Sequence, residues 1–383
     1  MFCLSLFAAL ASVSVAQAES TPLRVAVVGL EHGHVEGFLA ALPQHHDVEL
    51  VGIADADPSL FAKYQKKFGL AETLFFKSEA NMIETRHPEA VLVYTSIAGH
   101  RPAIEIAAQY GVSAMVEKPL SISLDDALAI RRTARHYGIH VLVNYETTWY
   151  ASNRAAHVEA DESHLGAIRR VVIHDGHQGP REIGVPPEFF DWLNDPAQGG
   201  AGALYDFGCY GADLMTWMMH GQAPLTVTAV LNHDKPQTYR VDDDATVVLT
   251  YPKAQAVIQA SWNWPFGRKD MEVYGATGYA ITVGPDKVRL RHEHDSDEQL
   301  TAAPPLEGVE RDSLAYLAAV IRGYVVPYGD TVRNAGGSMN VSVSGEKGGL
   351  GALDTNIVVM QILDAARESA RTDKTVQLKS LED

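Results

Sequence analysis

The triplet Glu117-Lys118-Pro119 places an acid beside a lysine directly after a predicted strand, residues 113–116. A second polar run, Thr95 to His100, ends the strand predicted over residues 90–95. In an open sheet of parallel strands the carboxyl ends line the ligand crevice. A lysine next to an acid there lowers the pKa of a bound hydroxyl. The alternative interpretation of the triplet is a surface turn.

Three further polar residues follow a glycine-rich loop. Asp206, Tyr210 and Asp213 stand at i, i+4 and i+7 in the segment 203–219, whose apolar spacing predicts a helix. Polar groups on a stripe that should bury apolar side chains cost free energy unless they serve a site or satisfy one another. A functional site and a hydrogen-bonded core network are both consistent with this pattern.

Residues 29–34 read Gly-Leu-Glu-His-Gly-His and occupy the place of a G-x-G-x-x-G motif, with only the first glycine in register. Asp55 closes the next predicted strand 26 residues after Gly29, near the spacing at which a carboxylate accepts hydrogen bonds from an adenosine ribose. This favours NAD over NADP. Glu31 lies where a pyrophosphate would approach, and His32 or His34 could offset its charge. In the alternative, Gly29 only makes a turn and Asp55 caps a helix.

Strands and helices alternate from Leu23 onward, and five such alternations within about 120 residues indicate a parallel sheet covered on both faces. Asp57-Pro58 has the pattern of a helix start. From about Arg169 short strands follow one another, which indicates a large, mainly antiparallel sheet. The predicted fold class is α/β, with a Rossmann-type domain over residues 22–145 and an α+β domain with an open sheet over 146–383. Helices are expected at 203–219, 313–324 and 353–372.

The composition is that of a globular protein: 383 residues, 46% hydrophobic and 21% charged. The formal net charge of −17 argues against a nucleic-acid partner. Residues 1–18 are apolar and end in Ala-Gln-Ala, which resembles a secretory signal, although no lysine or arginine precedes the apolar run. A buried N-terminal helix or strand is the alternative. The interpretation as a leader predicts a periplasmic or secreted protein without a membrane span, in which Cys209 has no disulfide partner.

Taken in order, these motifs resemble the glucose-fructose oxidoreductase and inositol dehydrogenase (Gfo/Idh/MocA) family over about residues 23–378. The family carries a T-P-x-x-x-H loop, E-K-P, G-G-G-x-x-x-D-x-x-x-H-x-x-D, and a terminal S-A-x-x-x-x-x-V-x-L. The corresponding segments here are 95–100, 117–119, 199–213 and 369–378. Ser96 departs from the family's proline, and Glu31 and His34 depart from two of its glycines.

The resemblance implies that Lys118 binds and polarises the reacting hydroxyl, with Asp206 beside it. Tyr210 takes the proton-transfer position, where many members have histidine, and Lys118 would provide the cation that its phenol needs. Plausible substrate contacts in loops over the crevice are Tyr145, His174, His177 and Trp192. The implied cofactor is NAD, contacted by Gly29, Leu30, Glu31, His32, His34, Asp55, Thr95, His100 and Glu117.

The expected reaction is oxidation of a hydroxyl on a sugar or cyclitol-like substrate. If the leader is real, NAD is held tightly and regenerated in each turnover, as in an enzyme with two sugar substrates. The alternatives are a redox-neutral glycosidase or isomerase of the same family, and a carbohydrate-binding protein that has lost turnover. A homodimer or homotetramer is expected, because an open sheet face needs cover. We expect no metal: His292-Glu293-His294 is interpreted as part of a solvated hairpin.

Overall fold

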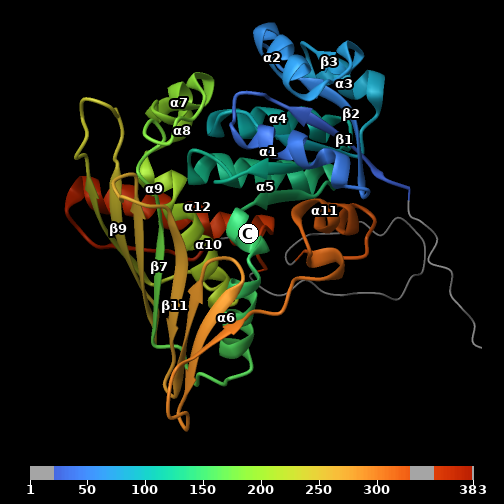
Figure 1. Cartoon of the computed structure of the whole chain (residues 1–383). Helices are drawn as coiled ribbons and strands as arrows, with labels where there is room; N and C mark the ends of the chain where they lie inside the picture. The colour runs from blue at the N-terminus through green and yellow to red at the C-terminus, as the bar shows by residue number, and fades with distance from the viewer. Residues whose placement is uncertain (1–20, 328–348, 382–383) are drawn as a thin grey trace, which may run out of the picture.

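A computed structural model of the chain describes residues 21–327 and 349–381. The predicted leader at residues 1–18 lies outside the described residues. The chain forms two sheets, with helices packed against both (Figure 1).

The first sheet has six parallel strands in the order β3-β2-β1-β4-β5-β6, which confirms the predicted Rossmann-type sheet. Helix α2 begins as predicted, because the Asp57 side chain accepts a hydrogen bond from the Ser59 amide and Pro58 takes the first helical position. The strands are β1 (Leu23–Val28), β2 (Val48–Ala54), β3 (Phe75–Phe76), β4 (Ala90–Val93), β5 (Ser113–Glu117) and β6 (Val141–Asn144). The helices are α1 (His34–Ala41), α2 (Pro58–Phe68), α3 (Glu79–Arg86), α4 (Ile97–Gln109) and α5 (Leu124–Tyr137).

The second sheet has nine strands in the order β14-β13-β12-β11-β7-β10-β9-β8-β15. Among the described strands of this sheet only β7 and β10 pair in parallel, so the predicted, mainly antiparallel sheet is confirmed. In chain order, the first five strands of this sheet are β7 (Arg170–Gly176), β8 (Thr226–Asn232), β9 (Asp244–Thr250), β10 (Gln255–Ser261) and β11 (Arg268–Tyr274). The others are β12 (Gly278–Val283), β13 (Lys287–His292), β14 (Gln299–Ala302) and β15 (Val376–Gln377). His292 ends β13 at the turn toward β14, so the predicted hairpin is present.

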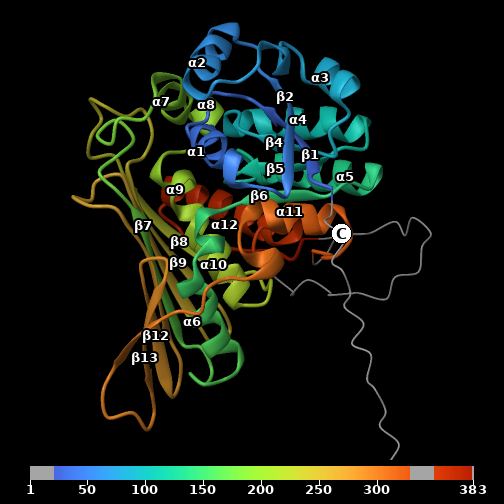
Figure 2. The same ribbon diagram turned by 45° about the vertical axis from the view of Figure 1, so that its right-hand side comes forward.

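Helices α10 and α12 pack against the inner face of this sheet, and α8 packs on α4 of the first domain (Figures 1 and 2). Helices α6, α7 and α8 were not predicted; α7 and α8 have only 7 and 4 residues, too few for a periodic pattern. The helices are α6 (Ala151–Asp161), α7 (Pro187–Leu193), α8 (Pro196–Gly199), α9 (Ala203–Asp206), α10 (Gly208–Met218), α11 (Ser313–Ile321) and α12 (Leu353–Thr372). One hydrophobic core continues from the helices on β4 and β5 to the inner face of the nine-stranded sheet.

The predicted helix over 203–219 is wrong in one respect, because it is broken at Phe207 into α9 and α10. In a continuous helix the Asp206 carbonyl would accept a hydrogen bond from the Tyr210 amide. Here the Tyr210 amide bonds to the Phe207 carbonyl instead, and the Asp206 carbonyl accepts from Lys118. Asp206 therefore does not share a helical face with Tyr210 and Asp213. The described part of the chain contains no helix long and apolar enough to cross a membrane.

Candidate active site between the two domains

Lys118 and Asp206 form a buried ion pair between the first sheet and α9. Lys118 follows β5 directly, and its Nζ donates to Asp206 Oδ1 and, at 3.0 Å, to the Asp206 carbonyl. The other carboxylate oxygen of Asp206 accepts from Trp262 Nε1 at 2.9 Å. Lys118 is 5% exposed and Asp206 7%. The pair ties the two domains together at the carboxyl end of β5.

The ion pair keeps both groups charged despite their burial. Burial by itself lowers the pKa of Lys118, but the Asp206 carboxylate outweighs this and raises that pKa above its ordinary value. Burial likewise opposes the ionised form of Asp206, and the charge and hydrogen bond of Lys118 hold the pKa of Asp206 below its ordinary value. The site therefore holds a fixed ammonium group next to a fixed carboxylate.

Tyr210 lies beside this pair on α10. Its ring centroid is 5.2 Å from Lys118 Nζ and 4.8 Å from Lys269 Nζ. Burial, followed by the Glu146 carboxylate, raises the pKa of the Tyr210 phenol well above its ordinary value. Within residues 21–327 and 349–381 the Tyr210 hydroxyl has no protein hydrogen-bond partner. A neutral phenol with a free hydroxyl is placed to donate a proton or a hydrogen bond to a bound group.

A cavity of about 290 Å³ brings these residues together. One side is polar and the other, formed by residues 180–193, is largely apolar. The polar lining comprises Lys118, Asp206, Tyr210, Lys269, His177 and His34. Burial lowers the pKa of His177, whose Nδ1 accepts from the Gly179 amide at 2.9 Å. Of the four predicted substrate contacts, only His177 lines this cavity.

Tyr145, Trp192 and His174 lie elsewhere, which corrects their predicted placement over the crevice. Tyr145 is fully buried behind Tyr210 and donates its hydroxyl to Asn356 Oδ1 at 2.8 Å. Trp192 packs on His32 and donates to the Glu31 carbonyl at 3.4 Å. His174 Nδ1 lies 3.1 Å from Asp270 Oδ1. His174 follows Ile173, an inner-face residue of β7, so its side chain points to the other face of the sheet. Tyr145 and Trp192 support site residues without facing the cavity.

The turn after β1 has the geometry of a nucleotide-binding loop. Gly29 has φ +86°, and a Cβ there would lie 2.6 Å from Thr95 Cγ2 and 2.7 Å from the Thr95 amide, so only glycine fits. Asp55 Oδ2 accepts from the Leu30 amide at 2.6 Å and Oδ1 from the Asp57 amide at 2.7 Å. A second cavity, of about 270 Å³, is lined by Gly29, Glu31, Asp55, Lys77, Glu79 and Thr95.

The lining of this second cavity includes Asp55, the residue predicted to bind the adenosine ribose of NAD. Asp55 lies at the carboxyl end of β2, where a carboxylate binds ribose hydroxyls. Glu31 and Glu79 add two more carboxyl groups, and burial raises the pKa of Glu79 to about 8. The Asp55 carboxylate opposes the extra phosphate of NADP at this place, whereas Glu79 is largely neutral near pH 7 and Lys77 adds a positive charge to the lining. Asp57, rather than Asp55, caps α2.

Glu31 contacts the amide of Ser96, the residue directly before α4. Its Oε1 accepts from the Ser96 amide at 2.6 Å, and Ser96 Oγ bonds to Gln198 at 2.9 Å. Burial raises the pKa of Glu31, while the Ser96 hydrogen bond opposes that rise. The carboxylate is thereby held against the protein backbone.

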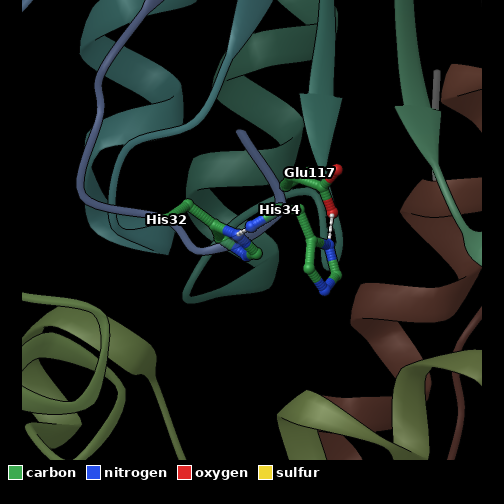
Figure 3. A group of neighbouring side chains, drawn as sticks. All are labelled: His32, His34 and Glu117. Atoms are coloured by element: carbon green, nitrogen blue, oxygen red, sulfur yellow. Dashed lines mark hydrogen bonds and ion pairs between the residues drawn. The ribbon is translucent and has the colours of Figure 1, made fainter. Parts of the chain in front are cut away.

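His32, His34 and Glu117 form a cluster at the ends of β1 and β5 (Figure 3). His34 Nδ1 lies 2.9 Å from Glu117 Oε2, and His32 Nδ1 accepts from the His34 amide at 3.2 Å. Burial lowers the pKa of His32 well below its ordinary value, so this ring is neutral. Burial opposes ionisation of Glu117, but His34 holds the pKa of Glu117 below its ordinary value. His34 is therefore the partner of the buried Glu117, whereas the Glu31 carboxylate is held by the Ser96 amide.

The remaining predicted cofactor residues divide into two groups. Thr95 lines the second cavity, and its hydroxyl bonds to the Ser96 carbonyl at 2.9 Å. His100 is fully buried in α4, and its Nδ1 bonds to the Leu120 carbonyl at 3.2 Å. His100 therefore joins α4 to the segment after Lys118 and does not line either cavity described above.

Sequence reasoning missed Lys269, Asp175 and Trp262. The alternation of apolar and polar residues along β11 and β7 could have identified Lys269 and Asp175. Lys269 is in phase with Met271 and Val273 of β11, and Asp175 with Val171 and Ile173 of β7, all of which are fully buried apolar residues. A charged residue in the apolar phase of a strand marks a candidate site residue. No comparable pattern singles out Trp262.

Two family models match the chain, and together they cover most of it. The model described as "Oxidoreductase family, NAD-binding Rossmann fold" matches residues 23–145, and the GFO/IDH/MocA C-terminal domain matches residues 153–281. The chain belongs to the Gfo/Idh/MocA family. It is an oxidoreductase with that family's NAD-binding domain, as its sequence predicted.

Named relatives of this Gfo/Idh/MocA chain include D-apiose dehydrogenase from Paraburkholderia graminis, 25% identical over 87% of this chain and 84% of the relative. Trans-1,2-dihydrobenzene-1,2-diol dehydrogenase from Macaca fuscata fuscata is 24% identical over 59% of this chain and 63% of its own. Aldose-aldose oxidoreductase from Caulobacter crescentus, complexed with glycerol, shares the fold with a TM-score of 0.74 and 21% identity, over 93% of this chain and 100% of the other. An inositol dehydrogenase homologue with NAD+ from Azotobacter vinelandii superposes with a TM-score of 0.76 at 18% identity, over 94% and 98%.

Proposed function

We propose that this oxidoreductase acts on a hydroxyl group of a sugar or cyclitol-like substrate bound in the cavity beside Lys118 and Tyr210. One observation carries the proposal: an ammonium group, a carboxylate and a neutral phenol from three different elements meet in one cavity at the carboxyl end of β5. Relatives named for D-apiose and for aldoses support a sugar-like substrate.

In this proposal Lys118 donates a hydrogen bond to the reacting oxygen and stabilises negative charge that develops on it. Tyr210 moves the proton to or from that oxygen. Asp206 fixes the Lys118 side chain, and Trp262 fixes Asp206. Gly29, Asp55 and Thr95 would hold NAD, with Glu31, His34 and Glu117 near it. When bound, NAD supplies the two-electron oxidant or reductant.

We further propose that the protein is exported and holds NAD tightly. The apolar segment before Ala18 supports export. Because free NAD is scarce outside the cytoplasm, a freely exchanging dehydrogenase would lack its second substrate there. An enzyme that oxidises one sugar and reduces another regenerates NAD on the protein, and the resemblance to an aldose-aldose oxidoreductase supports this version.

The first test is to purify the chain from Glu19 onward, denature it and identify any released nucleotide by mass and ultraviolet spectrum. Stoichiometric NAD is the expected result. An empty protein that binds added NAD would contradict the tightly held cofactor but not the oxidoreductase. An empty protein that also fails to bind added NAD would favour a carbohydrate-binding protein.

The second test is turnover by variants of the site. Tyr210→Phe and Lys118→Met are each expected to lower kcat by about 10²- to 10⁴-fold, the usual contribution of a positioned proton donor. Ile183→Ala, in the apolar wall of the cavity, is the control and should change KM more than kcat. Unchanged turnover in both site variants would refute the proposed roles. Release of a glycosidic leaving group without net NADH would identify the redox-neutral alternative.

A further inference from the structure

Lys269 is a lysine on the apolar face of the nine-stranded sheet. Its neighbours in phase along β11, Met271 and Val273, are fully buried. Its side chain is 22% exposed and reaches into the cavity that holds Lys118 and Tyr210. A lysine placed among buried apolar positions loses hydration, and the polar groups around it must compensate for that loss.

The contacts of Lys269 differ from those of Lys118. Lys118 is fixed by two hydrogen bonds to the buried Asp206. Lys269 pairs with Glu146, whose side chain is 52% exposed and also accepts from Tyr150. Lys269 Nζ is nevertheless the closer of the two ammonium groups to the ring of Tyr210.

Asp175 lies directly opposite Lys269 in the β7–β11 pairing, on the same face of the sheet. It is 1% exposed, and neither carboxyl oxygen has a hydrogen-bond partner in the described ranges. Buried carboxyl groups are nearly always hydrogen-bonded, so an unpartnered one beside a lysine needs an explanation. Burial, only partly offset by Lys269, raises the pKa of Asp175 well above its ordinary value.

We propose that Lys269 is a second positioning residue of the site, which holds a positive charge over Tyr210 and thereby controls proton transfer at the Tyr210 hydroxyl. Glu146 is the ionised partner of Lys269. Asp175 is neutral while Glu146 is present, and it forms the ion pair with Lys269 when the Glu146 carboxylate is removed. The proposal rests on the proposed function only in that Tyr210 is the proton-transfer residue. It adds a lysine that the sequence motifs do not contain.

Charged and titratable groups approach Tyr210 from several elements, including β7, where Asp175 lies opposite Lys269. Lys118 and Glu117 approach from the end of β5, Asp206 from α9 and Cys209 from α10. Glu146 and Tyr145 come from the segment after β6, and Lys269 from β11. The Asp206 carboxylate balances the charge of Lys118, and the Glu146 carboxylate balances the charge of Lys269. Because Lys118 is locked to Asp206, the Lys269–Glu146 pair is the adjustable part of this field.

The test is a direct titration of residue 210. Incorporating 3,5-difluorotyrosine at position 210 makes the phenol more acidic than that of tyrosine, and its ¹⁹F signal reports this residue alone, without substrate or turnover. Lys269→Met should raise the titration midpoint by about one pH unit, because a cation within about 4–6 Å favours the phenolate. Lys269→Arg keeps the charge and should restore most of the difference.

The partner carboxyl groups give the matched variants. Glu146→Gln removes a negative charge and should lower the midpoint, whereas Asp175→Asn alone should leave it unchanged. In the Glu146→Gln background, Asp175→Asn should lower it further, because Asp175 then holds Lys269. A midpoint that is the same in wild type, Lys269→Met and Glu146→Gln would overturn the proposal, as would a Lys269→Arg variant that behaves like Lys269→Met.

The kinetic consequence separates this proposal from the proposed function. For hydroxyl oxidation, kcat should rise with pH as Tyr210 loses its proton, and Lys269→Met should move that rise to higher pH by the same interval. If Tyr210→Phe retains full turnover, the proposed role of Tyr210 fails while the ¹⁹F titration still measures the effect of Lys269. If Tyr210→Phe is inactive and the titration does not respond to Lys269, only the inference about Lys269 fails.

Discussion

At the residue scale, Glu31 and Ser96 are two departures from the family pattern that contact each other. The pattern has glycine and proline at these positions. A proline at 96 has no amide hydrogen, so it could not donate to Glu31 as Ser96 does at 2.6 Å. The φ of −56° at Ser96 would accommodate proline, so the backbone itself does not require serine. The two substitutions therefore depend on each other.

A double-mutant cycle on this pair should show coupling. Ser96→Pro alone leaves the partly buried Glu31 carboxylate without its donor and should lower the free energy of unfolding by about 1–2 kcal/mol. Adding Glu31→Gly should recover most of that loss. Urea unfolding measures both. Ser96→Ala keeps the amide that donates to Glu31 and removes the hydroxyl, which contacts Gln198 and also favours the ionised Glu31, so it should cost less than Ser96→Pro. Additive effects of the two substitutions would contradict the coupling.

Much of the site could be predicted from residue types, but its contacts could not. Lys118, Asp206 and Tyr210 were identified by motif, and they do meet in one cavity. Spacing along the chain carries no information on which amide Glu31 reaches or that Tyr145 faces Asn356. These contacts depend on how the two domains pack, which is a property of the folded chain.

At the scale of the elements, alternation and periodicity predicted the strands well and failed where a tertiary contact breaks a helix. The limits of α12 agree with the predicted ones. At the break, the Asp206 carbonyl accepts a hydrogen bond from Lys118, which lies 88 residues earlier in the chain than Asp206. No local pattern in 203–219 contains that information. Asp213, one turn after Tyr210 on α10, does not line the site cavity.

We predict that Asp213 makes the stability of the protein depend on pH. The Asp213 side chain is fully buried on α10, and neither carboxyl oxygen has a partner among the described residues. Burial raises the pKa of Asp213 well above its ordinary value. The folded state thus binds a proton that the unfolded state releases above about pH 4. The free energy of unfolding should fall as pH rises from about 4 toward neutrality.

Asp213→Asn removes the titrating group, so the free energy of unfolding should decrease less between pH 4 and neutrality. At pH 8 the variant should be more stable than wild type by about 1–3 kcal/mol. Unfolding free energies at pH 5 and pH 8 measure it. Asp364→Asn on α12 is a useful comparison, because that carboxylate accepts hydrogen bonds from the Leu124 amide and Tyr205 and should lose stability instead. A variant Asp213→Asn that is less stable than wild type at pH 8 would show that the ionised carboxylate is needed.

At the scale of the whole molecule, the two sheets use their faces differently. The inner face of the nine-stranded sheet is covered by α10 and α12 and shares its core with the first domain. The outer face carries a row of valines across its centre, since Val257 of β10 pairs with Val172 of β7 and Val248 of β9. All three are partly exposed, and Val230 of β8 is 61% exposed. Such a row favours contact with another protein surface.

We predict that a second copy of the chain covers this face, since an isologous contact makes the row self-complementary. Sedimentation velocity should give twice the mass of one chain. Val257→Lys places a charge at the centre of the row and should raise the dissociation constant at least about 30-fold, equal to about 2 kcal/mol. Thr301→Lys, on the edge strand β14, is the control and should leave the assembly intact. A wild-type protein that sediments as a single chain at all concentrations, or a dimeric Val257→Lys, would show that the outer face is not the contact between copies.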